Sequence, residues 1–208
     1  MLTATETRAT AIARGRAIKR VNAWTGILCG DLPALALGLL FPTRLQQWVA
    51  GFGVGFLWAS LFEYAYHRFL LHLPGTFFAR RHLEHHASVG TLTEAEHVNF
   101  GSSPIWVIVL FAINGVPVMI ADLLFGLGMA PGIFLAFACY FITVEEMHWR
   151  IHLGERLPPV LRAYHLAHHA RPTHGSTFSC HCGIRCWDPR GGSFLWPIPI
   201  SSSDKKCM

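Results

Sequence analysis

Four clusters of histidine restrict the fold of this chain more than any other feature of its sequence. They read HRFLLH at 67–72, HLEHH at 82–86, HWRIH at 148–152 and HLAHH at 165–169. Residues three or four apart share one face of a helix, so each HxxHH triplet can present three imidazoles on one side. HRFLLH, whose histidines are five apart, fits the end of a helix better. The sequence therefore predicts helices whose histidine faces converge on one site.

The clustered histidines have the chemistry of metal ligands. Imidazole suits zinc, iron, copper and nickel, and the absence of cysteine from every cluster argues against a thiolate-rich zinc site or an iron–sulfur cluster. Ten nitrogens are too many for one ion, whereas two ions with about five ligands each would use them all. The pattern favours a two-metal centre over histidines gathered on a solvated surface. Its predicted ligands are His67, His72, His82, His85, His86, His148, His152, His165, His168 and His169.

Composition places this centre beside a membrane. The 208 residues are 52% hydrophobic and only 14% charged, which is too apolar for an ordinary soluble domain. Four stretches are long enough to cross a bilayer core of about 30 Å. They cover residues 24–41, 47–66, 104–124 and 130–147. The first contains Asp31 and Pro33, so a re-entrant or interfacial segment is its alternative. The predicted fold is an all-α integral membrane protein with about four transmembrane helices in two hairpins.

Basic residues predict the orientation of these hairpins, because loops rich in Lys and Arg stay in the cytoplasm. Only Arg44 lies between the first two stretches, and no Lys or Arg lies between the last two, where FGLGMAPG at 125–132 has the composition of a turn. Both turns are therefore expected away from the cytoplasm. The N and C termini and the histidine clusters are expected on the cytoplasmic side, where the histidines form a helical, two-metal cap.

The chain divides into three predicted parts. Residues 1–22 form a basic arm that lacks the long apolar run of a secretory signal, residues 23–200 form the membrane-embedded domain, and residues 201–208 form a disordered tail. The net charge of +5 favours contact with anionic lipid over nucleic-acid binding. The six cysteines suggest no disulfide framework and are expected to be free thiols, with a small metal knuckle at CHCGIRC as the alternative. They are Cys29, Cys139, Cys180, Cys182, Cys186 and Cys207.

The clusters resemble the histidine boxes of the membrane-bound fatty acid hydroxylase and sterol desaturase superfamily, and most of all its fatty acid hydroxylase branch. EYAYHRFLLH at 63–72 is similar to the first box of that branch, HWRIHLGERLP at 148–158 to the third, and YHLAHH at 164–169 to the last. The resemblance covers residues 55–190. The chain departs from the pattern after the last box, where STFSCHCGIRCWD keeps Trp187 and Asp188 but replaces a glycine-rich approach with cysteine and histidine.

The resemblance implies an oxidoreductase with a non-haem di-iron centre, held by the ten clustered histidines. Its cofactors would be two Fe²⁺ ions, which zinc can replace on purification, with molecular oxygen as co-substrate. The implied activity is the hydroxylation of a membrane lipid's acyl chain, a monooxygenase reaction of lipid metabolism. A sterol or carotenoid hydroxylase and a desaturase of the same superfamily remain alternatives, although carotenoid-ring hydroxylases usually have a wider third box. The alternative outside enzymes is a membrane protein that stores or senses metal.

Electrons are expected from a separate carrier, a ferredoxin or cytochrome with its reductase. An acidic carrier could dock on arginines near the histidines, although the same arginines could serve only to set the topology. They are Arg80, Arg81, Arg150 and Arg162.

Carboxylates near the clusters are candidates to accept hydrogen bonds from metal-bound imidazoles. Glu63 lies one turn before His67, and Glu145 shares a helical face with His148. Both lie at the ends of apolar stretches, where an unpaired charge is costly, which makes them better candidates than Glu84. His97, His174 and His181 lie outside the clusters and are expected to be surface histidines, with His97 and His174 as alternative ligands.

Overall fold

The computed structural model describes residues 3–73, 75–154 and 159–170, and these ranges contain helices and no strand, as the sequence predicts. The elements are α1 (Ala4–Leu40), α2 (Leu45–Ala65), the π-helix η1 (Tyr66–Leu71), α3 (Phe77–Ser88), α4 (Glu94–His97), α5 (Ile105–Phe125), α6 (Ala130–Leu153) and α7 (Pro159–Ala170). Several predictions fall on residues outside the described ranges. These residues are 201–208, Cys180, Cys182, Cys186, Cys207, His174, His181, Trp187 and Asp188.

Three helices, α1, α5 and α6, are long and apolar enough to cross a membrane. The last two coincide with the predicted spans at 104–124 and 130–147. Helix α2 occupies the place of the span predicted at 47–66, but its three glycines and its polar ends lower its average hydropathy, and it is not among the three. Within the described residues, length and composition therefore support three spans, and the expected number of about four stays a prediction.

Helix α1 joins the predicted arm and the predicted first span into one helix of 37 residues. It begins at a capping box, in which the Thr3 hydroxyl accepts a hydrogen bond from the Glu6 amide (3.2 Å) and the Glu6 carboxylate accepts one from the Thr3 amide (2.7 Å). It continues through Pro33. The boundary predicted at residue 22 therefore falls within a continuous helix.

Small residues let α1 pack closely on the rest of the fold. Its buried positions are Ala11, Gly15, Asn22, Gly26, Gly30 and Ala34, which recur at helical spacing. A Cβ atom added at Gly15 would lie 2.1 Å from the carbonyl oxygen of Ala95 in α4, and one added at Gly30 would lie 2.6 Å from the Ala138 side chain in α6. Small residues at helix interfaces in membranes allow this kind of backbone approach.

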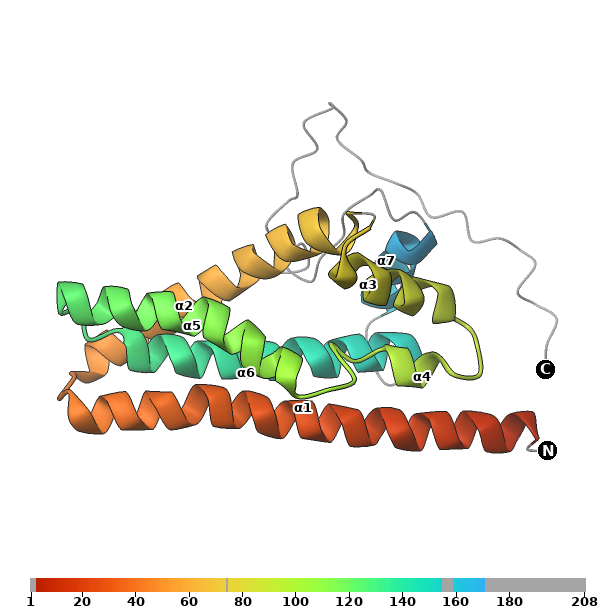
Figure 1. Cartoon of the computed structure of the whole chain (residues 1–208), viewed down its shortest axis with the longest axis horizontal. Coiled ribbons are helices and arrows are strands. Elements are labelled where there is room, and N and C mark those ends of the chain that lie inside the picture. Colours follow the sequence, from red (N-terminus) through yellow and green to blue (C-terminus); the bar gives the residue numbers. More distant parts are fainter. Residues whose placement is uncertain (1–2, 74, 155–158, 171–208) are drawn as a thin grey trace, which may run out of the picture.

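The helices form two hairpins, α1–α2 and α5–α6, whose turns lie at the same end of the molecule (Figure 1). The two turns touch, because Nε2 of Gln47 donates a hydrogen bond to the Leu127 carbonyl at 2.7 Å. Helix α5 ends at Gly126, which adopts the left-handed conformation (φ 62°), so the turn predicted at 125–132 is confirmed. The elements that carry the histidines lie toward the opposite end (Figure 1).

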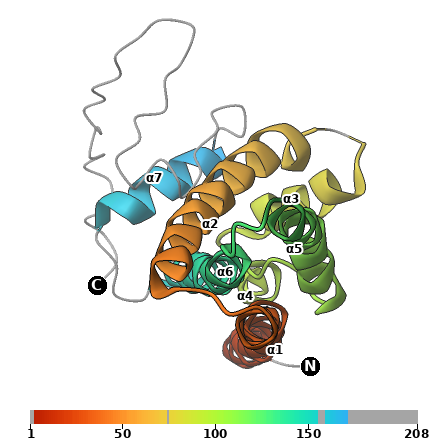
Figure 2. The same ribbon diagram turned by 90° about the vertical axis from the view of Figure 1, so that its left-hand side faces the viewer.

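Helix α6 is the central helix of the fold and packs against α1 on one side and α2 on another (Figure 2). Its aromatic side chains form the core with residues of α5. This core consists of Val107, Phe111, Ile133, Phe137 and Phe141. The outer faces of α1, α2 and α5 leave many large apolar side chains exposed, among them Leu28, Leu32, Val49, Leu57, Ile113 and Ile120. Such continuous apolar surface suits contact with lipid.

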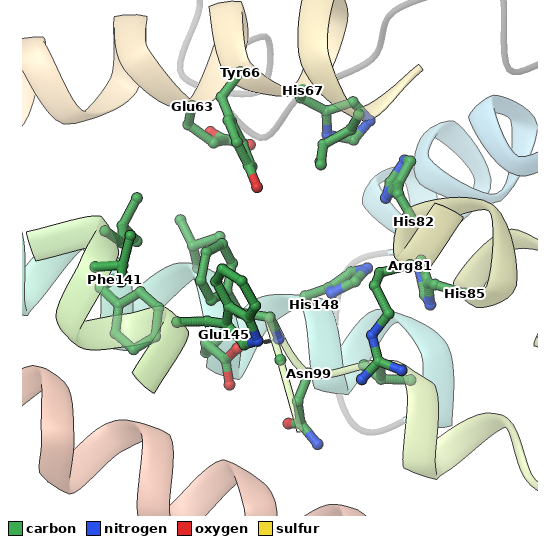
Figure 3. A pocket seen from close by; sticks show the side chains of 18 of the residues that line it. Glu63, Tyr66, His67, Arg81, His82, His85, Asn99, Phe141, Glu145 and His148 are labelled. Carbon is green, nitrogen blue, oxygen red and sulfur yellow. Dashed lines mark hydrogen bonds between the residues drawn. The ribbon is translucent and has the colours of Figure 1, made fainter. Parts of the chain in front are cut away.

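A cavity of about 290 Å³ lies between α2, α5 and α6 (Figure 3). At mid-helix level its walls are apolar and include Ala59 of α2, Ile113 of α5 and Phe137 of α6. Toward the histidine end its walls include histidines from all four clusters, namely His67, His82, His85, His148 and His165. One continuous space therefore connects the apolar middle of the bundle with the histidines.

Candidate metal centre

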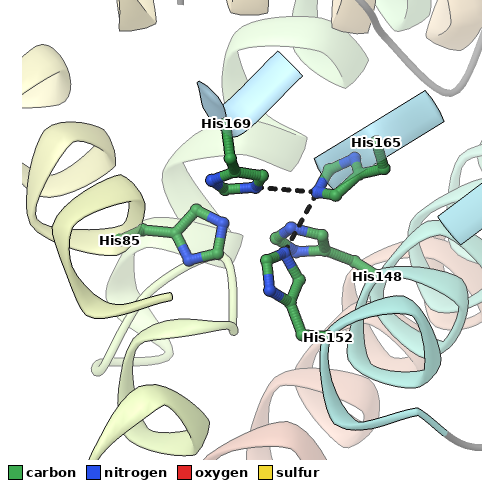
Figure 4. Close-up of side chains that lie close together, drawn as sticks. All are labelled: His85, His148, His152, His165 and His169. Atoms are coloured by element: carbon green, nitrogen blue, oxygen red, sulfur yellow. Dashed lines mark hydrogen bonds between the residues drawn. The ribbon is translucent and has the colours of Figure 1, made fainter. Parts of the chain in front are cut away.

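The structure brings the ten clustered histidines together, nine of them in two groups. In the first group one ring nitrogen from each residue lies within 4.8 Å of all the others (Figure 4); its members are His85, His148, His152, His165 and His169. The second group meets the same limit and contains His67, His72, His82 and His168. His86 lies between the groups, with its Nε2 2.9 Å from Nε2 of His82 and its ring 4.2 Å from the ring of His169.

Helices α3 and α7 each contribute histidines to both groups. In α3, His82 belongs to the second group and His85 to the first, and in α7, His168 belongs to the second and His165 to the first. The HxxHH spacing explains this division, since its histidines lie on one face but at successive positions along the helix. Each triplet therefore connects the two groups.

The π-helix η1 explains the unusual spacing of the first cluster. On an α-helix, residues five apart point about 140° away from each other. A π-helix has a wider turn with i→i+5 hydrogen bonds, and it carries His67 and His72 to a ring separation of 5.2 Å, tilted by 32°. The expectation that this cluster lies at a helix end is confirmed, because His72 caps the last turn.

Ring nitrogens within each group face one another at distances that suit shared coordination. Nε2 of His165 lies 3.0 Å from Nε2 of both His152 and His169, and Nε2 of His67 lies 2.9 Å from Nε2 of His168. Two nitrogens each about 2.1 Å from one ion and at right angles to each other are separated by roughly 3 Å. The lone pairs of each group thus converge as they would around a metal ion.

Buried nitrogens without hydrogen-bond partners support the same fit. Neither ring nitrogen of His85, which is 5% exposed, has a partner within the described part of the chain, and the same holds for Nδ1 of His86 and of His169. A buried polar atom without a partner destabilises the fold. A metal ion would satisfy His85, so these residues fit a metal centre better than a packed cluster of imidazoles.

Three of the clustered histidines outside the long helices favour the neutral form that binds metal. Burial, followed by the proximity of His168, lowers the pKa of His72 to about 4 and that of His86 to about 4. Burial and the neighbouring His86 lower the pKa of His169 to about 2. Adding a proton to any of them would place positive charge in a crowded site with little water.

A carboxylate that the sequence analysis did not single out contacts the first group. Nδ1 of His152, whose side chain is fully buried, lies 2.8 Å from Oε1 of Glu94, and the other carboxylate oxygen accepts a hydrogen bond from the Gly90 amide at 2.9 Å. Burial alone would raise the pKa of Glu94, but these two hydrogen bonds outweigh it and lower the pKa. The bond directs Nε2 of His152 toward the other histidines, as carboxylate partners of metal-bound imidazoles do.

The two acids predicted as histidine partners line the cavity. Glu63 accepts a hydrogen bond from the Tyr140 hydroxyl at 2.6 Å, and Glu145, which is buried, accepts one from the Phe100 amide at 2.5 Å (Figure 3). Their predicted role toward the histidines stays a prediction. Glu84 pairs with Arg81 at 3.4 Å. His97 lies in α4 beside the cavity and belongs to neither histidine group.

Arg81 and Arg150, two of the predicted docking arginines, form contacts with neighbouring carboxylates. Arg81 donates to the Ser102 hydroxyl at 2.7 Å as well as to Glu84, and Arg150 pairs with Glu146 at 2.6 Å. Arg80 in α3 and Arg162 in α7 are exposed.

The sequence model of the fatty acid hydroxylase family matches residues 52–193, which include all four histidine clusters. No curated protein and no solved structure matches the chain.

Proposed function

The chain belongs to the fatty acid hydroxylase family, and we propose that it is an oxygen-dependent, di-iron hydroxylase of the acyl chain of a membrane lipid. The observation that carries the proposal is the cavity that leads from the apolar middle of the bundle to both histidine groups. An unactivated aliphatic carbon has no acidic proton and no leaving group, so side chains alone cannot attack it, and two bound irons would supply the oxidising chemistry.

The histidines would hold these irons in two unequal sets. The first group offers five nitrogens and the second offers four, and His86 is placed to complete the second or to bridge both. Glu94 holds His152 in the tautomer that leaves Nε2 free. Both sets have ligands on α3 and α7; the first set also has ligands on α6, and the second also has ligands at η1, which follows α2. The metals would therefore also join the cap to the bundle.

The cavity would bind and orient the acyl chain. Its apolar walls exclude water from the chain, and they direct one end of the chain toward the histidines that face the same space (Figure 3). A protein that only stored or sensed metal would have no use for this apolar space, so the cavity favours an enzyme. Desaturation, or hydroxylation of a sterol or carotenoid, would use the same metals and is distinguished by its product.

We also propose that the histidine end faces the cytoplasm, with both termini, and that a separate ferredoxin- or cytochrome-type carrier delivers electrons there. The distribution of Lys and Arg supports this orientation. The exposed Arg80 and Arg162 lie on the two helices that carry the histidine triplets, where an acidic carrier would come close to the metals.

Lipid mass spectrometry tests the proposed function. Membranes from cells that express the wild-type chain should contain an acyl lipid heavier by one oxygen, and membranes with His168→Ala should lack it. His181→Ala makes the same chemical change outside the four clusters and should retain the product. Lipids that lack two hydrogens would replace the hydroxylase by a desaturase, and an oxygenated sterol or carotenoid would replace the acyl substrate. Unchanged lipids with bound metal would support the metal-binding alternative.

A further inference from the structure

The cavity exists because α2 leaves the bundle after a close approach at one end. Near the turns, α2 is in contact with α6: a Cβ atom added at Gly51 would lie 2.2 Å from the Met129 carbonyl oxygen, and one added at Gly55 would lie 2.8 Å from Cα of Ile133. After this approach, α2 diverges from α5 and α6 toward the histidine end (Figure 1). In the described part of the chain, α2 and α5 hardly touch each other.

A hydrogen bond crosses between these two diverging helices. Nε1 of Trp58 in α2 donates to Oδ1 of Asn114 in α5 at 3.0 Å. The amide nitrogen of Asn114 donates to the Leu110 carbonyl at 2.9 Å, which orients its oxygen toward the indole. Asn114 is 9% exposed and lines the cavity, together with its neighbour Ile113.

Trp58 itself does not line the cavity, but its partner Asn114 does. The Trp58 side chain is 49% exposed, and the neighbouring Leu57, Leu61 and Ile113 are more than half exposed. These apolar groups belong to the surface that suits lipid. The Trp58–Asn114 hydrogen bond therefore connects the lining of the cavity with the apolar outer surface of α2.

We infer that acyl chains enter the cavity sideways from the bilayer, between α2 and α5, and that the Trp58–Asn114 hydrogen bond closes this α2–α5 entrance. The inference rests on the proposed function and names how its lipid substrate reaches the site. In hydrocarbon, water cannot replace a broken hydrogen bond, so the closed form is favoured. A single cross-helix bond is nevertheless weak enough to open and reform as a lipid passes.

Two variants remove the bond. Trp58→Phe keeps a smaller aromatic ring but loses the N–H donor, and Asn114→Leu keeps a branched side chain with the same number of non-hydrogen atoms but loses the acceptor. Trp48→Phe is the matched control, because Trp48 also donates through Nε1, to the Thr43 hydroxyl at 2.6 Å, near the turn end of the same helix. The partner of Trp48, Thr43, does not line the cavity, whereas the partner of Trp58, Asn114, does.

The measurement is the rate of lipid exchange. Purified protein is mixed with nanodiscs that contain deuterated phosphatidylcholine, and mass spectrometry then measures how much deuterated lipid stays bound to the protein. Loss of a membrane hydrogen bond of average strength corresponds to about threefold, so Trp58→Phe and Asn114→Leu should each speed exchange by about that factor. The double variant should be no faster than either single variant, and Trp48→Phe should match the wild type.

If the wild type, Trp58→Phe and Asn114→Leu exchanged lipid at the same rate, the inferred entrance between α2 and α5 would be wrong. It would also be wrong if Trp48→Phe exchanged lipid as fast as these two variants. This readout needs no turnover. If the exchange rate depends on Trp58 and Asn114 but no oxygenated lipid forms, the result supports the entrance and contradicts the hydroxylase proposal. If oxygenated lipid forms but the exchange rate is the same in both variants and the wild type, the result supports the hydroxylase proposal and contradicts the entrance.

Discussion

Glu94 and His152 form the contact that links the short helix α4 to the candidate metal centre, with Oε1 of Glu94 2.8 Å from Nδ1 of His152. Glu94→Gln keeps the size of the side chain but removes its charge, so the imidazole becomes a weaker ligand. Changes to such partners typically cost 10–100-fold in metal affinity. We expect a loss in that range, measured by competition with a chelator.

The matched control for this prediction is Glu96→Gln in the same helix. Glu96 pairs with Arg14, whose side chain is 68% exposed, and it contacts neither histidine group. Equal metal affinity in the wild type and Glu94→Gln would contradict the role of Glu94, and so would an equal loss in Glu96→Gln.

The two histidine groups predict two separable ions. His85 belongs to the first group and His72 to the second. His85→Ala should lower the iron content from about two ions per chain toward about one, and His72→Ala should do the same at the other site, because each removes a ligand from one set of about five. Elemental analysis of the purified variants measures this. An unchanged iron content in both variants would disprove the ligand assignment.

The contact between α1 and α4 should be sensitive to one methyl group at Gly15. Its added Cβ would lie 2.1 Å from the Ala95 carbonyl oxygen, a backbone atom that cannot move alone. Gly15→Ala should lower the free energy of unfolding by about 1–3 kcal/mol and should also weaken metal binding, because Glu94 is the residue before Ala95. Thermal unfolding in detergent measures the first effect.

Gly53→Ala in α2 is the control for Gly15→Ala, since nothing lies within 4 Å of its added Cβ. This variant should unfold at the same temperature as the wild type or higher, because alanine favours helix over glycine. If Gly15→Ala were as stable as Gly53→Ala, the close packing of α1 would be wrong.

The lowered histidine pKa values predict acid sensitivity of the metal-free protein. An unfolded histidine has a pKa of about 6.5, whereas the folded values for His72 and His86 are about 4. Between these values the unfolded chain takes up protons that the folded chain does not, so stability is present above about pH 6.5 and falls as the pH decreases toward 4. The melting temperature of the metal-free protein should be lower at about pH 5 than at about pH 7. A melting temperature that stays constant or rises on acidification would contradict this.

The histidine groups could be predicted from sequence because their spacing is local. Three clusters have intervals of three or four residues, which an α-helix places on one face, and the structure brings all ten residues together. The π-helix between His67 and His72 was harder to predict from the sequence, because the interval of five residues was the one sign that this segment is not a regular α-helix.

Glu94 could not have been found from its sequence context. Helix α4 has four residues, too few for a periodic pattern, and the position of Glu94 depends on the packing of α4 against α1 and α6. The close packing of α1 does have a signal in the sequence, because small residues recur at helical spacing from Ala11 to Ala34. Charge and hydropathy patterns do not reveal this signal. The cavity arises from the divergence of α2, which depends on tertiary packing after Gly55.

The central claim is that a di-iron centre held by these histidines inserts oxygen into an acyl chain. The most direct measurement is turnover of the iron-loaded protein in lipid nanodiscs with a reductant under ¹⁸O₂, followed by mass spectrometry of the acyl chains. The account predicts a hydroxylated chain that carries ¹⁸O, in the wild type and not in His85→Ala. A hydroxylated chain that carries only oxygen from water, or equal product from both proteins, would contradict it.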